Sequence, residues 1–133
     1  MNVVPVRLEG ATIVLEPLTP SHAAPLFRHS DPALFRHTLD WPEDGGLAAW
    51  EAWVLRGLSA PASLDFAVLL RASGEPIGAT AYLEIRPAHR GLEIGRTWIA
   101  RPWQGTRVNP ESKYLLLRHA FETLGALRVQ LKT

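Results

Sequence analysis

The sequence predicts an α+β domain. Three observations support this class. The hydrophobic residues first follow helical spacing, then alternate as in strands, and return to helical spacing near the end of the chain. Short turn sequences separate the three alternating segments in the middle. With 133 residues, 47% of them hydrophobic, the chain has the size and composition of one globular domain.

The first third is predicted to contain one strand and two helix starts. Residues 11–17 alternate as a strand does. Residues 19–29 follow as a helix, with Pro20 near the first turn, where proline is tolerated. Asp31-Pro32 indicates another helix start. Residues 41–46 contain proline and two glycines and are therefore expected to form a loop.

Residues 47–58 are predicted to form a helix that carries Trp50 and Trp53 one turn apart. We interpret these two indoles as core residues in preference to a pocket wall. Trp41, in the preceding loop, is the better candidate for a substrate pocket. Three acidic side chains of that region either attract a cationic amine or are simply solvated: Asp40, Glu43 and Asp44.

The middle of the chain is predicted to be an antiparallel meander, because short turns join three alternating segments. The expected strands are residues 65–71, 77–85 and 93–99. The middle strand is the longest of the three. Such a meander provides a continuous sheet on which the remaining helices can pack.

A loop at residues 101–107 leads into the last predicted helix. Asn109 is a good N-cap, Pro110 fits the first helical position, and Gly125 fits the position after the last turn. Its expected buried face consists of Leu117, Ala120, Phe121 and Leu124. Residues 128–132 begin a final strand, which gives the order β-α-α-β-β-β-α-β.

Composition argues against several functional classes. The net charge is only +1 and there is no basic run, so nucleic acid is not an expected partner. Cysteine is absent, which excludes disulfides and thiolate metal sites, and the five histidines lack metal-binding spacing. No stretch approaches the roughly 18 apolar residues of a membrane span. We therefore expect a cytoplasmic protein with no metal and no membrane association.

The strand, loop and helix between Glu93 and Asn109 form a candidate diphosphate site. The first N–H groups of a helix lack internal partners, and the helix dipole favours negative charge there. Gly105 allows close approach of a ligand to the backbone, and Arg101 and Arg107 can contact phosphate oxygens. A purely structural loop and cap is the alternative, because both nucleotide fingerprints, G-x-G-x-x-G and the P-loop, are absent.

The segment VNPESKYLLLRHAFE at 108–122, preceded by RPWQGT at 101–106, closely resembles the acetyl-CoA segment of the GNAT superfamily of N-acyltransferases. HRGLEIG at 89–95 and LGALRV at 124–129 are similar to the branch that contains ribosomal-protein N-terminal acetyltransferases. The resemblance implies a mixed central sheet flanked by helices. It also implies acetyl-CoA as co-substrate and a primary amine as acceptor, either a protein N-terminus or a small amine.

The family's diphosphate loop reads Q/R-x-x-G-x-G/A, and by this resemblance six residues should hold acetyl-CoA: Gln104, Gly105, Thr106, Arg107, Val108 and Asn109. Gly105 occupies the first glycine position, whereas Pro102 and Arg107 depart from the pattern. An arginine would be strained there if the backbone required a positive φ. Trp98, Ile99 and Ala100 are expected to contact the acyl-pantetheine arm through backbone groups. One of their N–H groups would stabilise the oxyanion.

Glu93 is the leading candidate for the general base, acting on the amine through water, and a surface carboxylate is an equal alternative. Tyr114 is expected to pack in the core first. The family's general acid follows the last residue of this sequence, so the domain is expected to be truncated after its fifth strand. The alternative function is a non-catalytic acyl-CoA-binding module, completed by a second copy of the chain in a homodimer.

Overall fold

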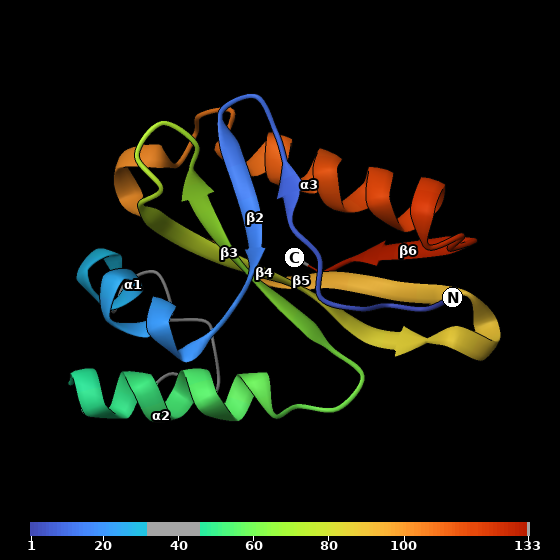
Figure 1. Cartoon of the computed structure of the whole chain (residues 1–133), viewed down its shortest axis with the longest axis horizontal. Helices are drawn as coiled ribbons and strands as arrows, with labels where there is room; N and C mark the ends of the chain where they lie inside the picture. Colours follow the sequence, from blue (N-terminus) through green and yellow to red (C-terminus); the bar gives the residue numbers. More distant parts are fainter. Residues whose placement is uncertain (32–45, 133) are drawn as a thin grey trace.

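A computed structural model of the chain describes residues 1–31 and 46–132 (Figure 1). Trp41, its acidic neighbours and most of the predicted second helix start lie outside the described residues. The described part contains one six-stranded sheet in the order β1-β2-β3-β4-β5-β6. The strands are Leu8–Glu9, Ile13–Pro17, Leu64–Leu70, Pro76–Arg86, Gly91–Ile99 and Arg128–Leu131.

Neighbouring strands are antiparallel except for β5 and β6, which are parallel. The antiparallel meander β3-β4-β5 is confirmed, with ends within two residues of the predicted ones. The crossover from β5 to β6 contains a helix, as a parallel connection requires. The first predicted strand begins at Ile13, and the two-residue strand β1 (Leu8–Glu9) precedes it. A strand this short has too few residues for a periodic pattern.

Helices cover both faces of the sheet (Figure 1). On one face lie η1 (Pro20–His22), α1 (Ala23–His29) and α2 (Leu47–Leu58). The other face is covered by α3 (Val108–Arg118), which continues into a π-helical turn, η5 (His119–Thr123). Short 3₁₀ turns, η3 (Pro87–His89) and η4 (Arg101–Trp103), follow β4 and β5. The predicted helix at 47–58 is confirmed with both of its ends.

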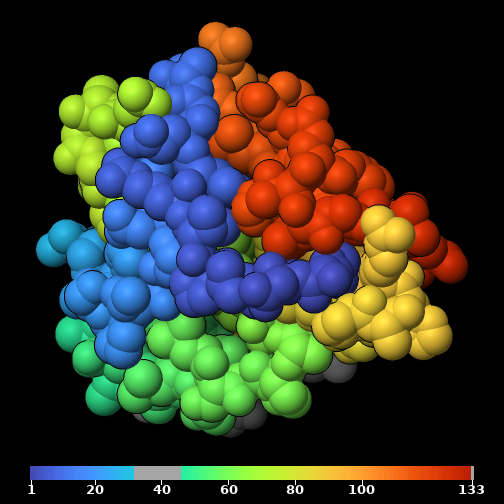
Figure 2. All heavy atoms as spheres, turned by 45° about the vertical axis from the view of Figure 1, so that its right-hand side comes forward, coloured from blue at the N-terminus to red at the C-terminus, as the bar shows by residue number. Residues whose placement is uncertain are grey.

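Each face of the sheet has its own apolar core. The larger core lies beneath α3 and includes Phe66, Tyr82 and Leu116, all of which are fully buried. The N-terminal segment contributes Met1, Val3 and Val6 to it, and Figure 2 shows that segment lying across the molecule beside α3. The smaller core lies beneath α1 and α2 and consists of Ala23, Leu26, Trp50, Val54, Ala79 and Trp98.

Three predictions for the last helix are wrong, and the first two concern its N-cap and the burial of Phe121. The N-cap is Arg107, so that Asn109 and Pro110 lie inside the first turn. Phe121 was expected in the buried face, yet 47% of it is exposed. The π turn changes the phase of the helix: the Leu124 N–H donates to the His119 carbonyl, five residues earlier. The hydroxyl of Tyr82 donates to the Leu116 carbonyl just before this turn, a contact of the kind that displaces the regular ladder.

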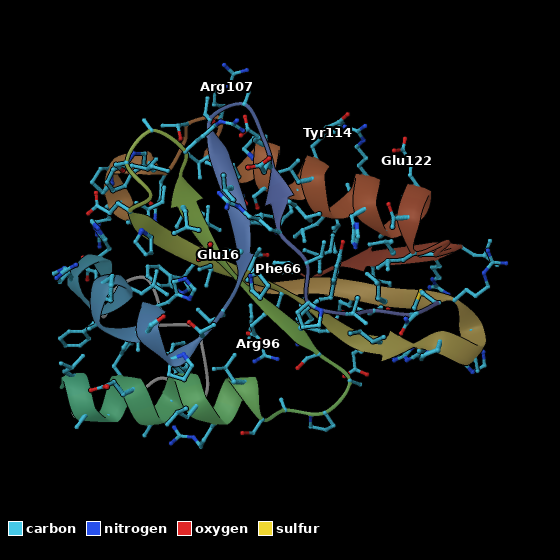
Figure 3. All side chains as sticks on the ribbon, in the orientation of Figure 1. Glu16, Phe66, Arg96, Arg107, Tyr114 and Glu122 are labelled. Atoms are coloured by element: carbon cyan, nitrogen blue, oxygen red, sulfur yellow. The ribbon has the colours of Figure 1, made fainter. Side chains whose placement is uncertain are left out.

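Gly125 does end this helix, as predicted, with a φ of 72° in the left-handed region that glycine adopts without strain. Ala120 and Leu124, the other part of the expected face, are buried. Tyr114 was expected in the core but is 57% exposed, and Figure 3 shows it directed away from the sheet. The helix therefore packs through a face rotated from the predicted one: Val108, Ser112, Leu115 and Leu116.

Candidate functional site

Strand β5 has an edge that no described strand covers along its second half. β6 pairs with β5 only from Gly91 to Ile94, and the Lys132 N–H donates to the Ile94 carbonyl at 2.9 Å. Beyond Ile94 the strand keeps β4 on one side alone within the described residues. We call the stretch from Gly95 to Ile99 the open edge.

The backbone of Ile99 faces the open edge. The next N–H, that of Ala100, donates to the Ile77 carbonyl at 2.8 Å, which directs Ala100 toward β4. Successive residues of a strand direct their N–H and C=O groups to opposite sides. The Ile99 carbonyl accordingly accepts a hydrogen bond from the Gln104 side-chain amide at 2.9 Å, away from β4. The Ile99 N–H lies on that same side and is directed toward the open edge.

The loop that follows β5 presents backbone donors around Gly105. The φ of Gly105 is 72°, and a Cβ added there would meet nothing within 4 Å. Among the described residues, no oxygen accepts from the backbone N–H of Gly105, Thr106 or Arg107, whereas the Val108 N–H donates to the Thr106 hydroxyl at 3.3 Å. Three successive backbone donors without an acceptor among the described residues thus lie directly before the start of α3, which suits an anion.

Arg107 is unstrained at the second glycine position of the predicted loop pattern. Its φ is −76° and its ψ is −5°, which an L-residue adopts readily. Figure 3 shows its side chain at the exposed tip of the loop, directed away from the sheet. Arg101, the other predicted phosphate contact, donates through Nε to a carboxylate oxygen of Asp31 at 2.6 Å. The loop therefore presents Arg107 as its outward cation.

A cavity of about 340 Å³ lies between the sheet and α2, on the face opposite α3. The indole of Trp98 meets that of Trp50 edge-on, with 5.8 Å between the ring centroids. The ring centroid of Trp53 lies 5.0 Å from that of Trp50. Trp50 is buried and its indole N–H donates to the Ala23 carbonyl at 2.9 Å, which confirms its predicted core role. Trp53 packs against the core and also lines the cavity. The wall is predominantly aromatic and apolar.

An ion pair between β3 and β5 also lines this cavity: Arg96 lies 3.3 Å from the carboxylate of Asp65. Arg96 is part of a β-bulge, with a φ of 51°, where the register with β4 shifts between Ala79 and Ala81. Figure 3 shows it between the sheet and α2. Burial raises the pKa of Asp65, and the guanidinium of Arg96 opposes that rise. No sequence signal predicted this pair, because a bulge leaves no periodic pattern.

The predicted site residues are brought together only in part. Trp98 lines the cavity, Ile99 faces the open edge, and Gln104 to Asn109 form the loop and the start of α3. Ala100 is buried and its N–H is bonded to Ile77. Glu93 lies apart from them. It pairs with Leu83 on one side and Gln130 on the other, where β6 still covers β5, and it does not line the cavity.

Two features are absent from residues 1–31 and 46–132. No group of three or more His, Asp or Glu side chains is arranged to hold a metal ion there. None of the helices in that part is both long and apolar enough to cross a membrane.

Known proteins share this sequence pattern and this geometry. The family model described as acetyltransferase (GNAT) domain matches residues 12–133. A crystal structure assigned as an acetyltransferase from T. thermophilus shares 38% sequence identity at a TM-score of 0.89, covering 99% of this chain and 69% of that one. A second structure with the same assignment shares 37% identity at a TM-score of 0.89, covering 98% of this chain. The present chain spans 66% of that second protein.

More distant structures share the fold. RimL, a ribosomal L7/L12 alpha-N-protein acetyltransferase solved in complex with coenzyme A, is 19% identical at a TM-score of 0.77. That match covers 95% of this chain and 73% of RimL. No curated protein is similar enough in sequence to be matched.

Proposed function

This chain belongs to the GNAT acetyltransferase family, and we propose that it binds acetyl-CoA and transfers the acetyl group to a primary amine by direct attack. The observation that carries the proposal is the continuity of two features. The open edge of β5, with the Ile99 N–H directed outward, leads straight into the loop of backbone donors at Gly105. A diphosphate and an extended acyl-pantetheine arm require this succession of donors.

In the proposed complex the diphosphate lies against the N–H groups of Gly105, Thr106 and Arg107, with Val108 and Asn109 at the start of α3 beside it. The positive end of the helix dipole favours the phosphate charge there. The arm extends along the open edge past Trp98, Ile99 and Ala100. A backbone N–H of this edge, that of Ile99, donates to the thioester oxygen and stabilises the oxyanion as the amine attacks.

The acceptor amine enters from the cavity beside Trp98. Three residues of the open edge line this cavity: Arg96, Thr97 and Trp98. The amine must lose its proton before it attacks. An α-amino group, with a pKa near 7.7–8.0, needs less help than a lysine, whose pKa is near 10.4. A protein N-terminus and a small amine are both proposed acceptors, and the fold shared with RimL supports the first. Trp41 is retained as a proposed wall of the pocket.

Glu93 is the proposed general base. Its position between Leu83 and Gln130 requires that the proton reach it through water. Glu93→Gln should then lower the rate at neutral pH while acetyl-CoA still binds. Glu122→Gln is the matched control, because Glu122 lies exposed at the end of the last helix and pairs with Arg118. Equal rates in the two variants would reject the role of Glu93.

Isothermal titration of acetyl-CoA into the 133-residue chain tests the proposal first. Desulfo-CoA and ATP serve as controls. We expect saturable binding of acetyl-CoA and desulfo-CoA and much weaker binding of ATP, because the arm contributes contacts along the open edge. Absence of binding by folded protein would reject the function. Binding without release of free CoA in the presence of N-terminal peptides and small amines would favour a non-catalytic acyl-CoA-binding module.

We also propose that two copies of the chain form a homodimer. β6 is an edge strand of the described sheet, and an edge strand can pair with a strand of a second copy. In light scattering we expect the average mass to rise with protein concentration toward twice 14.7 kDa. A single mass of 14.7 kDa at all concentrations would reject the dimer.

A further inference from the structure

Lys113 on α3 is a partly buried lysine without a carboxylate partner in the described part of the chain. Its Nζ donates to the Thr97 hydroxyl at 2.8 Å, and none of the ion pairs in this part includes it. The nearest acid along the helix, Glu111, is bonded to the backbone of Thr12 and Ile13 instead. Burial lowers the pKa of Lys113.

Thr97 locates this ammonium at the open edge. Thr97 precedes Ile99 by two residues in β5 and therefore shares its orientation in the strand. The Thr97 hydroxyl lies 2.9 Å from the Thr80 hydroxyl on β4. Thr97 also lines the cavity on the other side of the sheet. Lys113 reaches Thr97 from the α3 face, so the ammonium and the cavity lie on opposite sides of one residue.

An ammonium that is partly removed from water and has no opposite charge is unfavourable unless an anion compensates it. Other titratable groups facing this region do not supply one. Tyr82 on β4 donates its hydroxyl proton to the Leu116 carbonyl, and burial raises its pKa. His119, further along the helix, stacks on Tyr82. Among the described residues, therefore, no anion compensates the Lys113 ammonium, and a bound anionic group would stabilise it.

The proposed acetyl-CoA complex brings such a charge to this position. Lys113 is five residues beyond Val108, roughly 7 Å along the helix at 1.5 Å per residue. The diphosphate is proposed at the start of the helix, and the arm extends from there along the open edge toward Thr97. The thioester is proposed at the Ile99 N–H, two residues from Thr97 and therefore roughly 7 Å away at about 3.3 Å per residue. The flexible Lys113 side chain can cover that distance and reach the sulfur, where negative charge develops during the reaction.

We propose, as a consequence of the proposed function, that Lys113 is a catalytic residue that donates a proton to the departing sulfur of CoA. When the tetrahedral intermediate collapses, the C–S bond breaks and its electron pair moves to sulfur. The Lys113 ammonium gives one proton to this thiolate, forming the CoA thiol and leaving a neutral amine. The acceptor nitrogen loses its extra proton through water to the proposed base Glu93, and Lys113 regains a proton from solvent.

The test measures the pKa of the thiol of CoA bound to the protein, which needs no turnover. Thiolate absorbance is followed during a pH titration, with the desulfo-CoA complex as the blank. An opposite charge within about 4–6 Å lowers the pKa of an acid by one to three. We therefore expect the bound thiol to have a lower pKa in the wild type than in Lys113→Met, by about one or more. An Arg118→Met control on the exposed face of α3 should match the wild type.

The conservative variant separates the charge from the proton. Lys113→Arg keeps a cation that does not give up its proton, so it should preserve the low thiol pKa and still lose at least tenfold in acetyl transfer. Lys113→Gln replaces the methionine variant if the latter does not fold, as judged by circular dichroism. If CoA binds and its thiol has the same pKa in the wild type and in the neutral variants, the role of Lys113 is overturned while the proposed function is not. Failure of the wild type to bind CoA would overturn the proposed function together with it.

Discussion

The carboxylate of Glu111 accepts a hydrogen bond from the backbone N–H of Ile13 at 2.8 Å. The same carboxylate accepts from the Thr12 N–H at 2.9 Å, so an acidic residue in the first turn of α3 fixes the start of β2. Gly10 makes room for it, because a Cβ at that position would lie 2.6 Å from the Glu111 Oε2. This contact joins the two ends of the chain and positions the helix whose first turn forms the proposed diphosphate site.

Replacing Glu111 with glutamine should destabilise the fold. Both N–H groups donate to Oε2, so the glutamine oxygen can still accept them, but without the negative charge these bonds are weaker. The glutamine NH₂ group also cannot accept from the Thr12 hydroxyl, which donates to Oε1 of the glutamate. We expect the free energy of unfolding to fall by about 2 kcal/mol, measured by urea denaturation. Glu122→Gln is the control, since Glu122 pairs with Arg118 in full solvent and such pairs contribute little. Equal effects of the two substitutions would contradict this prediction.

Gly105 and Gly74 form a matched pair for testing the ligand loop. Both have positive φ, 72° and 77°, and neither has a neighbour within 4 Å of an added Cβ. Alanine at either position should cost about 1 kcal/mol of stability through backbone strain. Only Gly105→Ala should also weaken acetyl-CoA binding in calorimetry, because its methyl group would obstruct the approach to the loop donors. A similar loss of affinity in Gly74→Ala would mean that the effect is not local.

Arg96→Met should destabilise the protein in a pH-dependent way. The substitution leaves the Asp65 carboxylate, whose side chain is only 9% exposed, without its cation. We expect a loss of about 2 kcal/mol at pH 7, moderated by the partial exposure of Arg96. Burial already holds the pKa of Asp65 above its ordinary 3.8, and removing Arg96 raises that pKa further. The folded protein then binds the proton more readily than the unfolded chain does.

The deficit of Arg96→Met should therefore be largest above the raised pKa of Asp65 and should diminish as pH falls toward 3.8. Urea denaturation at a series of pH values measures this. The double variant Asp65→Asn/Arg96→Met has no buried carboxylate and should lose that pH dependence. A deficit that stays constant with pH in the single variant would show that Asp65 does not cause it.

Tyr82→Phe should lower the free energy of unfolding by about 1 kcal/mol, because the hydroxyl that donates to Leu116 at 2.6 Å is lost from a buried site. Amide hydrogen exchange in the π turn at residues 119–123 should also change, since the Leu116 carbonyl next to it is then free to accept from a helix N–H. Tyr114→Phe, exposed on the same helix, is the control and should change neither quantity. Unchanged exchange in Tyr82→Phe would separate the π turn from this hydrogen bond.

The local features of the site were predictable and their combination was not. The strand before the loop, Gly105 and the helix after it all follow from short-range patterns in the sequence. The N-cap was assigned to Asn109 because that residue type commonly caps helices, yet the helix begins at Val108. Glu93 was predicted as the base that acts on the amine, and its separation from the open edge depends on where β6 stops pairing with β5.

The sequence by itself determined the kinds of element, their order and the meander, because hydrophobic period and turn chemistry act between residues close in the chain. The tertiary structure alone decided which side chains meet. Glu111 reaches Ile13, Arg96 reaches Asp65 through a bulge, Lys113 reaches Thr97, and the indoles of Trp50 and Trp98 close one wall of the cavity. These contacts join residues far apart in sequence, and their geometry is fixed only when both faces of the sheet are packed.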